Sequence, residues 1–429
     1  MEQLKITGGA PLSGALAIHG AKNSVLPILA ACCLCSSACV LHNCPKIDDV
    51  ETALEIIRAL GGAARREGST LLIDPTGLHA CCIEPRLAGR MRSSVLFLGA
   101  LLARAGRAEL ALPGGCPLGS RPVDLHVAAL RRLGAQIVQT PQRITAELPH
   151  QRDADIYLPL PSVGATENVL LACARGQSLV RLSGAAREPE IEDLIGFLRA
   201  CGADITGAGT GELTIRGVRA LHGATYTILP DRIETASYLC ALAGCGGDVE
   251  LRRTDARLLA PVIAALRQAG CVITVRRDTL RAVRSAPLRA LRPVVTAPYP
   301  GFPTDAQAVL MAALLKAQGQ SVLHETIFER RFLHVPELQS LGADICLEGS
   351  VAFVRGVAAL HGAALHASDL RGAAALVIAA MMADGESTLT GLHHLRRGYE
   401  NFEQNLKNLG ANIKSVDIPA PFVYNNPCD

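Results

Sequence analysis

The sequence predicts an α/β protein made of two similar domains, each built from three repeated units. Its length of 429 residues exceeds what one ordinary hydrophobic core uses. A pattern of amphipathic helix, glycine stop and short strand also recurs six times, with marker glycines Gly61, Gly134, Gly202, Gly270, Gly342 and Gly410. The spacings between these glycines are 73, 68, 68, 72 and 68 residues, so the units follow one another at nearly even intervals.

The helix before the third glycine shows the pattern of one unit. Ile191, Leu194, Ile195 and Leu198 are spaced to form a single apolar face, and Gly202 supplies the left-handed residue that ends the helix. A unit of this length holds about two helices and several strands. Three units per half predict two domains, and the cleft between two domains is a usual place for a ligand.

Composition excludes several classes of protein. The chain is 49% hydrophobic and 19% charged, which is typical of a globular protein, and its net charge of +3 is too small to indicate nucleic-acid or membrane binding. The start of the chain lacks the pattern of a signal peptide, so we expect a cytoplasmic location. The longest apolar run, residues 24–41, contains a proline, four cysteines and three serines, and we expect a buried helix followed by a strand.

The 15 cysteines do not predict a disulfide scaffold or a metal site. Their number is odd, the chain is long, and Cys32 and Cys35 form a C-x-x-C without a second pair or nearby histidines. No P-loop, dinucleotide fingerprint, H-E-x-x-H or G-x-S-x-G motif is present. We therefore expect neither a metal nor a cofactor.

Two clusters near the N-terminus join cations to glycines. GAKNSVLP carries Lys22 and Asn23 at a helix start, where a lysine and backbone amides suit a phosphate; a capping turn with a solvated lysine is the alternative. PGGCPLGSRPVDLH carries Cys116 and Arg121, with Arg92 of GRMRSS as a possible neighbour. An arginine and a helix start favour the thiolate of a cysteine, and a surface turn that happens to contain a thiol is the alternative.

Two further clusters lie in the second half. YPGFPTDAQ places Asp305 at a loop-to-helix junction, where it is either a helix cap or a general base. Arginines recur in three turns of successive units, either as surface residues or as a converging anion site: Arg330, Arg331, Arg371, Arg396 and Arg397.

Taken together and in order, these motifs resemble a known family, the UDP-N-acetylglucosamine enolpyruvyl transferases (1-carboxyvinyltransferases) of the enolpyruvyl-transferase family. The resemblance spans about residues 1–418 and is carried by GAKNSVLPILAA, LPGGCPLGSRPVDLH, SVGATEN, AAREPEIEDL, LPDRIETASYL, FPTDAQA, FERRFLHVPEL, DLRGAAAL and RRGYE. It implies a fold of two inside-out α/β barrels, each of three repeated units, with one domain at 22–229 and the other at 1–21 and 230–429.

The resemblance also implies the reaction and the residues that perform it. The enolpyruvyl group of phosphoenolpyruvate passes to the 3-hydroxyl of UDP-N-acetylglucosamine with release of phosphate, in the first committed step of peptidoglycan synthesis. Cys116 is the implied general acid and Asp305 the implied base, while Lys22 and Arg397 complete the catalytic set. The implied substrate-binding residues are Lys22, Asn23, Arg92, Arg121, Pro122, Val123, Asp124, Leu125, Ser162, Val163, Asp305, Ile327, Arg331, Arg371 and Arg397.

Two positions depart from the family pattern. Leu160 stands where some relatives have a lysine, which puts a diphosphate contact in doubt, and Arg396 stands where relatives often have an aspartate. The second departure leaves open which arginine of the pair Arg396 and Arg397 points inward. The closest alternative is the sister enzyme 5-enolpyruvylshikimate-3-phosphate synthase, which is expected to lack PGGC and SVGAT. A non-catalytic nucleotide-sugar-binding or regulatory homologue is the other alternative.

Overall fold

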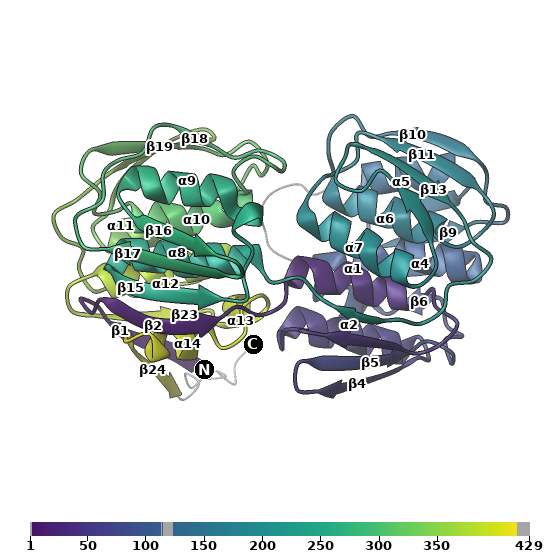
Figure 1. Ribbon diagram of the computed structural model, residues 1–429, viewed down its shortest axis with the longest axis horizontal. Helices are drawn as coiled ribbons and strands as arrows, with labels where there is room; N and C mark the ends of the chain where they lie inside the picture. Colours follow the sequence, from purple (N-terminus) through teal and green to yellow (C-terminus); the bar gives the residue numbers. More distant parts are fainter. Residues whose placement is uncertain (1, 113, 115–122, 418–429) are drawn as a thin grey trace, which may run out of the picture.

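The chain folds around two hydrophobic cores. The computed structural model describes residues 2–112, 114 and 123–417, and shows two lobes side by side (Figure 1). We call the part packed around the core that runs from Val25 to Ile228 the first lobe. The second lobe is packed around a core that combines Leu4–Ile18 with Ala236–Ile413. The beginning of the chain therefore belongs to the same core as residues 236–413.

The described residues of each lobe form three sheets of four strands. In every sheet an edge strand runs parallel to its neighbour and the other two pairs are antiparallel, and among the described residues no sheet closes on itself. The strands of the first lobe are β3 (Cys39–His42), β4 (Ala63–Glu67), β5 (Thr70–Asp74) and β14 (Thr225–Thr227); β6 (Cys82–Ile83), β7 (Arg107–Ala111), β8 (Gln136–Gln139) and β9 (Arg143–Glu147); and β10 (Ala154–Tyr157), β11 (Leu179–Ser183), β12 (Asp204–Thr206) and β13 (Glu212–Arg216).

The N-terminal strands complete two sheets of the second lobe. The strands of this lobe are β1 (Glu2–Thr7), β22 (Ala364–His366), β23 (Glu386–Thr390) and β24 (Asn412–Asp417); β2 (Leu12–Ala17), β15 (Gly247–Arg252), β16 (Val272–Arg276) and β17 (Thr279–Arg284); and β18 (Val294–Val295), β19 (Gln320–His324), β20 (Asp344–Glu348) and β21 (Val351–Arg355). β1 lies between β23 and β24, and β2 lies at the edge beside β15. The six-fold repeat alone did not predict this insertion.

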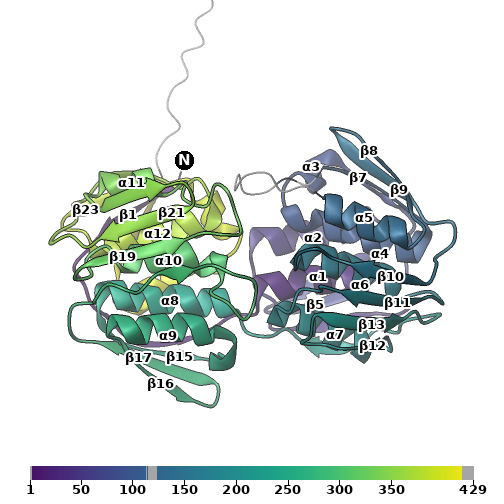
Figure 2. The same cartoon turned by 90° about the horizontal axis from the view of Figure 1, so that it is seen from above.

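Three central helices pack against one another inside each lobe. They are α1 (Lys22–Cys32), α4 (Leu96–Ala105) and α6 (Val163–Cys173) in the first lobe, and α8 (Arg232–Cys245), α10 (Thr304–Ala313) and α12 (Leu370–Met382) in the second. All thirteen residues of α12, for example, are buried. A helix that is apolar on every side belongs inside a core, which explains its position between the sheets (Figure 2).

Amphipathic helices cover the central ones, and four of them are longer than two turns. The outer helices are α2 (Asp48–Ala59), α5 (Asp124–Arg132), α7 (Pro189–Ala200), α9 (Ala260–Ala269), α11 (Val335–Ser340) and α14 (Phe402–Asn408). Shorter helical turns complete the chain: α3 (Pro85–Ala88), η1 (Arg92–Val95), η2 (Ala256–Leu259) and α13 (His393–Arg396). The predicted buried helix and strand within residues 24–41 are confirmed as α1 and β3.

All six marker glycines end an outer helix, as predicted. Each adopts a left-handed backbone, with φ between 93° and 113°. Gly270 is the plainest case, because it directly follows α9 and its φ is 113°. A side chain at this φ is disfavoured by contact between its Cβ and the backbone.

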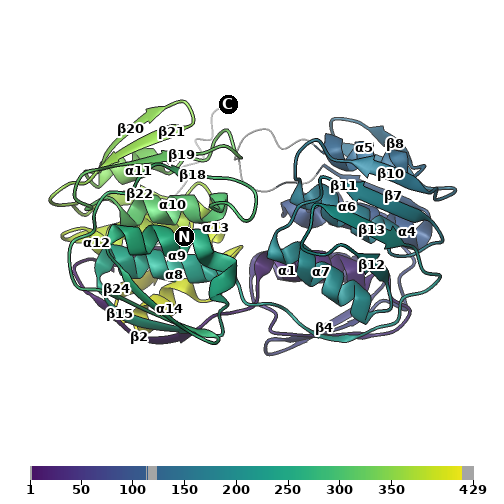
Figure 3. The same ribbon diagram turned by 45° about the horizontal axis from the view of Figure 1, so that its top comes forward.

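Two neighbouring segments connect the lobes (Figure 3). The N–H of Ala21 donates to the carbonyl of Leu229 at 2.8 Å, and the N–H of Asp231 donates to the carbonyl of His19 at 2.8 Å. The linking segments therefore bind each other directly before α1 and α8 begin. Among the described residues, no helix combines the length and the apolar character that crossing a bilayer requires.

We expect Gly270→Ala to lower the free energy of unfolding by about 1 kcal/mol, because alanine disfavours the left-handed backbone. No atom lies within 4 Å of the added Cβ, so the change in the free energy of unfolding comes from the backbone conformation and not from a steric clash. Gly211→Ala is the control, since its φ is outside the left-handed range and its Cβ would meet only the Ala185 carbonyl oxygen at 4.0 Å. Urea unfolding followed by circular dichroism measures both, and equal losses would contradict the prediction.

Candidate active site

A buried carboxylate joins a cation of the first lobe to a cation of the second. Asp49, the second residue of α2, accepts Lys22 Nζ on Oδ2 at 2.7 Å and Arg397 Nε on Oδ1 at 2.9 Å. All three side chains are at most 14% exposed. Burial raises the pKa of Asp49, but Lys22 and Arg397 outweigh burial, so the pKa of this carboxyl lies below its ordinary value. Lys22 is therefore a paired, buried cation and not a solvated lysine.

The two adjacent arginines at the end of α13 point to different partners. Arg397 binds Asp49 through Nε, and its Nη2 also reaches Oδ2 at 3.3 Å. Arg396 pairs instead with Glu2 of β1, and its side chain is 45% exposed. Arg397 is thus the arginine of this pair that faces the first lobe.

A second carboxylate holds two arginines within the second lobe. Asp305, the second residue of α10, accepts Arg331 Nη2 on Oδ1 at 2.7 Å and Arg371 Nη2 on Oδ2 at 3.0 Å. Both arginine side chains are almost fully buried, whereas the Asp305 side chain is 27% exposed. Arg331 also donates to the carbonyl of Thr304 at 2.9 Å. Because Pro303 occupies the cap position, Asp305 is not the helix cap that the sequence left as an alternative.

The pairing shifts the proton affinities of both partners. Burial raises the pKa of Asp305, but the guanidinium groups of Arg371 and Arg331 outweigh it and hold the pKa far below its usual range. Burial lowers the pKa of Arg371, and Asp305 more than reverses this. The guanidinium carbon of Arg371 also lies 5.3 Å from the ring centre of Tyr399.

Asp231, the residue that caps α8, binds the start of α1. Its Oδ2 accepts the backbone N–H of Lys22 at 3.1 Å, and its Oδ1 accepts the N–H groups of Ile233 and Glu234. Its charge also raises the pKa of Arg371, after the larger effects of burial, Asp305 and Tyr399. The starts of α1 and α8, which carry Lys22 and Asp231, are therefore in direct contact.

The remaining predicted site residues have varied surroundings. Ser162 caps α6, and its hydroxyl accepts the N–H of Ala165 at 3.3 Å. Ile327 is 39% exposed and Leu160 is 55% exposed. The other described members are Asn23, Arg92, Leu125 and Val163, which are half-buried, Val123, which is buried, and Asp124, which is exposed. Cys116, Arg121 and Pro122 lie outside the described residues.

Sequence reasoning missed several charged residues between the lobes. Asp49 belongs to an acidic helix start that resembles ordinary capping, so nothing local distinguished it. Glu190 of α7 and Arg232 of α8 form a buried pair, with Nε to Oε1 at 2.9 Å. Glu188 accepts the backbone N–H of Tyr299 at 3.2 Å. The segments REPEIE and DRIE lie within the family motifs, and their pattern of acidic and basic residues is the sequence signal for the Glu190–Arg232 pair.

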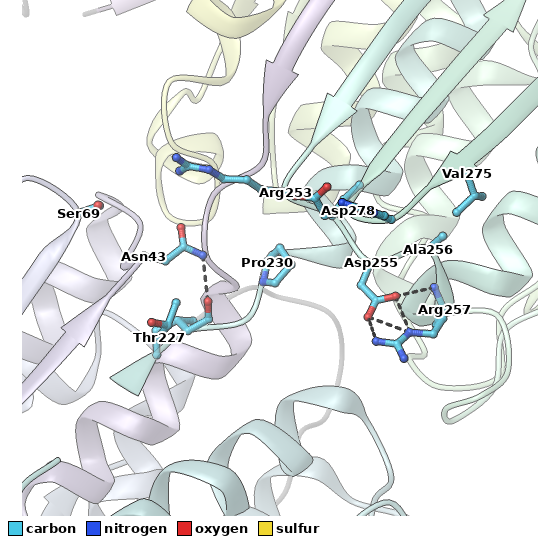
Figure 4. Close-up of a pocket in the computed structure, with 13 residues that line it drawn as sticks. Asn43, Ser69, Thr227, Pro230, Arg253, Asp255, Ala256, Arg257, Val275 and Asp278 are labelled. Atoms are coloured by element: carbon cyan, nitrogen blue, oxygen red, sulfur yellow. Dashed lines mark hydrogen bonds and ion pairs between the residues drawn. The ribbon is translucent and has the colours of Figure 1, made fainter. Parts of the chain in front are cut away.

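A cavity between the lobes lies elsewhere. It has a volume of about 760 Å³ and is lined by residues from the linking segment and both lobes (Figure 4). None of the described residues of the predicted site lines it. Within the described ranges, no group of three or more His, Cys, Asp or Glu side chains is arranged to hold a metal ion.

A family profile described as EPSP synthase (3-phosphoshikimate 1-carboxyvinyltransferase) matches residues 6–406 of the chain. The chain belongs to this family. UDP-N-acetylglucosamine 1-carboxyvinyltransferase 2 of Caldanaerobacter subterraneus subsp. tengcongensis is 43% identical over 416 residues, which cover 97% of this chain and 100% of the relative. The UDP-N-acetylglucosamine 1-carboxyvinyltransferase of Zymomonas mobilis subsp. mobilis is 45% identical over 430 residues, with coverages of 97% and 100%.

Solved structures of enolpyruvyl transferases share the fold. The enolpyruvyl transferase NikO from Streptomyces tendae matches with a TM-score of 0.88 and 29% identity, covering 97% of this chain and 99% of that one. EPSP synthase from Acinetobacter baumannii matches with a TM-score of 0.74 and 18% identity, covering 97% and 100%, and this likeness concerns the fold alone. The predicted enolpyruvyl-transferase fold is therefore confirmed.

We expect Asp49→Asn to lower the free energy of unfolding by about 3 kcal/mol, because it leaves Lys22 and Arg397 buried without a negative partner. Asp48→Asn is the matched control, since Asp48 is the exposed neighbour at the same helix start. Asp48→Asn should lower the free energy of unfolding by less than about 1 kcal/mol. Chemical unfolding at pH 7 measures both variants.

The same variant should alter the acid end of the pH–stability profile. The folded pKa of Asp49 is depressed, so its contribution is fully present above the unfolded pKa of about 3.9 and is lost as pH falls through the folded pKa. In the Asp49→Asn variant, the free energy of unfolding should therefore no longer include the decrease that protonation of Asp49 causes at acidic pH. A profile that parallels the wild type throughout this range would contradict the prediction.

Proposed function

We propose that this protein transfers the enolpyruvyl group of phosphoenolpyruvate to the 3-hydroxyl of UDP-N-acetylglucosamine and releases phosphate, the first committed step of peptidoglycan synthesis. The observation that carries this proposal is the match to relatives named for this activity, at 42–45% identity over 97% of the chain. No cofactor is part of the proposal. The cytoplasmic location stays a prediction from the sequence.

The charges between the lobes support this reaction. Phosphoenolpyruvate carries a carboxylate and a phosphate, and negative charge increases on the leaving phosphate as the C–O bond breaks. Lys22 and Arg397 already stand in fixed, buried positions on Asp49. Cations held in place before the reaction stabilise developing charge without a cost of reorganisation. We propose that Lys22, Arg121 and Arg397 bind the phosphate group of phosphoenolpyruvate. Arg331 and Arg371 bind its carboxylate group or contribute to closure of the lobes.

The low pKa of Asp305 constrains its proposed role as the base toward the sugar hydroxyl. A carboxylate bound by two guanidinium groups holds a proton poorly. An anionic substrate competes with Asp305 for Arg331 and Arg371. Once the substrate takes these donors, the pKa of Asp305 rises and the carboxylate becomes a better base. Binding of phosphoenolpyruvate would in this way activate the base.

The remaining assignments rest on the family motifs. Cys116 is proposed to protonate the methylene carbon, and Asn23, Arg92, Pro122, Val123, Asp124, Leu125, Ser162, Val163 and Ile327 are proposed to line the substrate sites. The domain boundaries, 22–229 against 1–21 with 230–429, also stay a proposal. The separate hydrophobic cores of the two lobes and the mutual binding of their linking segments support it.

Purified protein should release phosphate from phosphoenolpyruvate only when UDP-N-acetylglucosamine is present. The family profile carries the name of the shikimate enzyme, so shikimate 3-phosphate is the control acceptor. A colorimetric phosphate assay, with mass spectrometry of the enolpyruvyl product, separates the two activities. Release that depends on shikimate 3-phosphate instead would overturn the proposed function.

The epoxide fosfomycin should add its mass to the peptide that contains Cys116, because this thiol is the proposed reactive acid. The exposed thiols of Cys82 and Cys346 are matched controls, since they are accessible but have no assigned role. We expect modification of Cys116 to be faster with UDP-N-acetylglucosamine bound, as measured by peptide mass spectrometry. Equal modification of all three cysteines is the result that argues against an activated thiol.

A further inference from the structure

The cavity between the lobes has an unusual lining. It is bounded by Asn43 and Ser69 of the first lobe, by Thr227–Pro230 of the linking segment, and by two loops of the second lobe. These loops follow β15 and connect β16 to β17, and they carry Arg253 and Arg277. Figure 4 shows the Arg253 side chain extending toward the Asn43 side of the cavity. Its volume of about 760 Å³ is within the usual range for a small-molecule site.

Backbone strain is concentrated around this cavity. Among the described residues, only four positions other than glycine have a left-handed φ, and three of them line the cavity. These are Asn43 at 58°, Arg253 at 55° and Arg277 at 47°. Asparagine tolerates this backbone, but arginine does not favour it. Strained residues persist where the surrounding structure or a function requires them.

The other repeated units show which residues stand at the equivalent backbone positions. Arg253 directly follows β15. The position after the equivalent strand is a left-handed glycine in two units, Gly184 after β11 and Gly391 after β23, and the left-handed Asn43 after β3, whereas the residues after β7 and β19 are not left-handed. Arg277 begins the two-residue turn between β16 and β17. The first residue of the corresponding turns between β4 and β5 and between β20 and β21 is a left-handed glycine in both cases. Where these positions are left-handed in the units compared, they hold glycine or asparagine, so the backbone does not favour arginine at either position.

The charges of the lining are only partly neutralised. Arg257 is bound by Asp255, with Nη2 to Oδ2 at 2.6 Å. Within the described part of the chain, the guanidinium groups of Arg253 and Arg277 have no hydrogen-bond or ion-pair partner. Among the described lining residues, Asp278 is the only other acid, so the described side chains carry an excess of one positive charge. Guanidinium groups bind phosphate and carboxylate through paired N–H donors.

We propose that this cavity is a second binding site, for a small molecule that carries a phosphate or diphosphate group held by Arg253 and Arg277. The site differs from the proposed active site, because it shares none of the described catalytic or substrate-binding residues. Its walls belong to both lobes, so a ligand there binds one arrangement of the lobes better than another and shifts the equilibrium between them. The site is thus suited to a regulatory ligand.

Glycine substitutions test this proposal without damaging the backbone. The double variant Arg253→Gly/Arg277→Gly removes both guanidinium groups and places at each position a glycine, the residue that adopts this left-handed backbone in two other units. Without ligand, its midpoint of thermal unfolding should be higher than that of the wild type. Arg276→Ala is the matched control, since it removes one exposed arginine from the same hairpin but not from the cavity lining. Arg253→Lys/Arg277→Lys keeps the charges.

Pyrophosphate is the probe, in thermal-shift and calorimetric titrations of the full-length protein. Any binding at the proposed active site is common to all four proteins and cancels in the comparison. We expect pyrophosphate to raise the unfolding midpoint of the wild type and of Arg276→Ala by several degrees more than that of the glycine variant. The lysine variant should bind at least threefold more weakly than the wild type. The proposal would be overturned if the glycine variant bound pyrophosphate with the same stoichiometry and the same shift of the unfolding midpoint as the wild type. It would also be overturned if the wild type bound no pyrophosphate outside the active site.

Discussion

The arrangement of the two lobes depends on the need to pair buried charge. Asp49, placed at the start of one helix of the first lobe, holds a lysine of its own lobe and an arginine of the other. Glu190 and Arg232 make a second buried pair across the same boundary. Removing a charge from water is unfavourable unless a partner compensates, so each of these residues requires the other lobe to be in position. The same pairing leaves the cations prepared to bind an anion.

Several of these charges lie at helix starts. Lys22 begins α1, Asp49 lies in the first turn of α2, Asp305 in that of α10 and Arg371 in that of α12. The amide groups at a helix start are free to bind, and carboxylates are favoured there by the helix dipole. Arginines are not favoured at helix starts on electrostatic grounds, and Asp305 offsets this for Arg371. Acids thus organise a region whose proposed purpose is to bind anions.

The sequence predicted the repeated architecture more fully than the site. The six glycines that end helices and the apolar helices could be predicted, because both features depend on residues that are close together in the sequence. Lys22, Asp305 and the arginines were recognised through motifs, but Asp49 was not, since an acid in the first turn of a helix has an ordinary structural explanation. Arg396 and Arg397 could not be distinguished by sequence, because Glu2 and Asp49, their partners, are far away along the chain.

By itself, the sequence determined the number of units, the helix ends, the buried helix near the N-terminus and the family. These features follow from neighbouring residues or from motifs. Only the tertiary structure decided that β1 and β2 complete sheets of the second lobe, which cations share a carboxylate, and that two strained arginines line one cavity. Each of these depends on contacts between residues that are distant in the chain. The physical reason is that ion pairs and strand pairs form between residues that are close in space. A pattern among neighbouring residues in the sequence does not specify which distant residues come together.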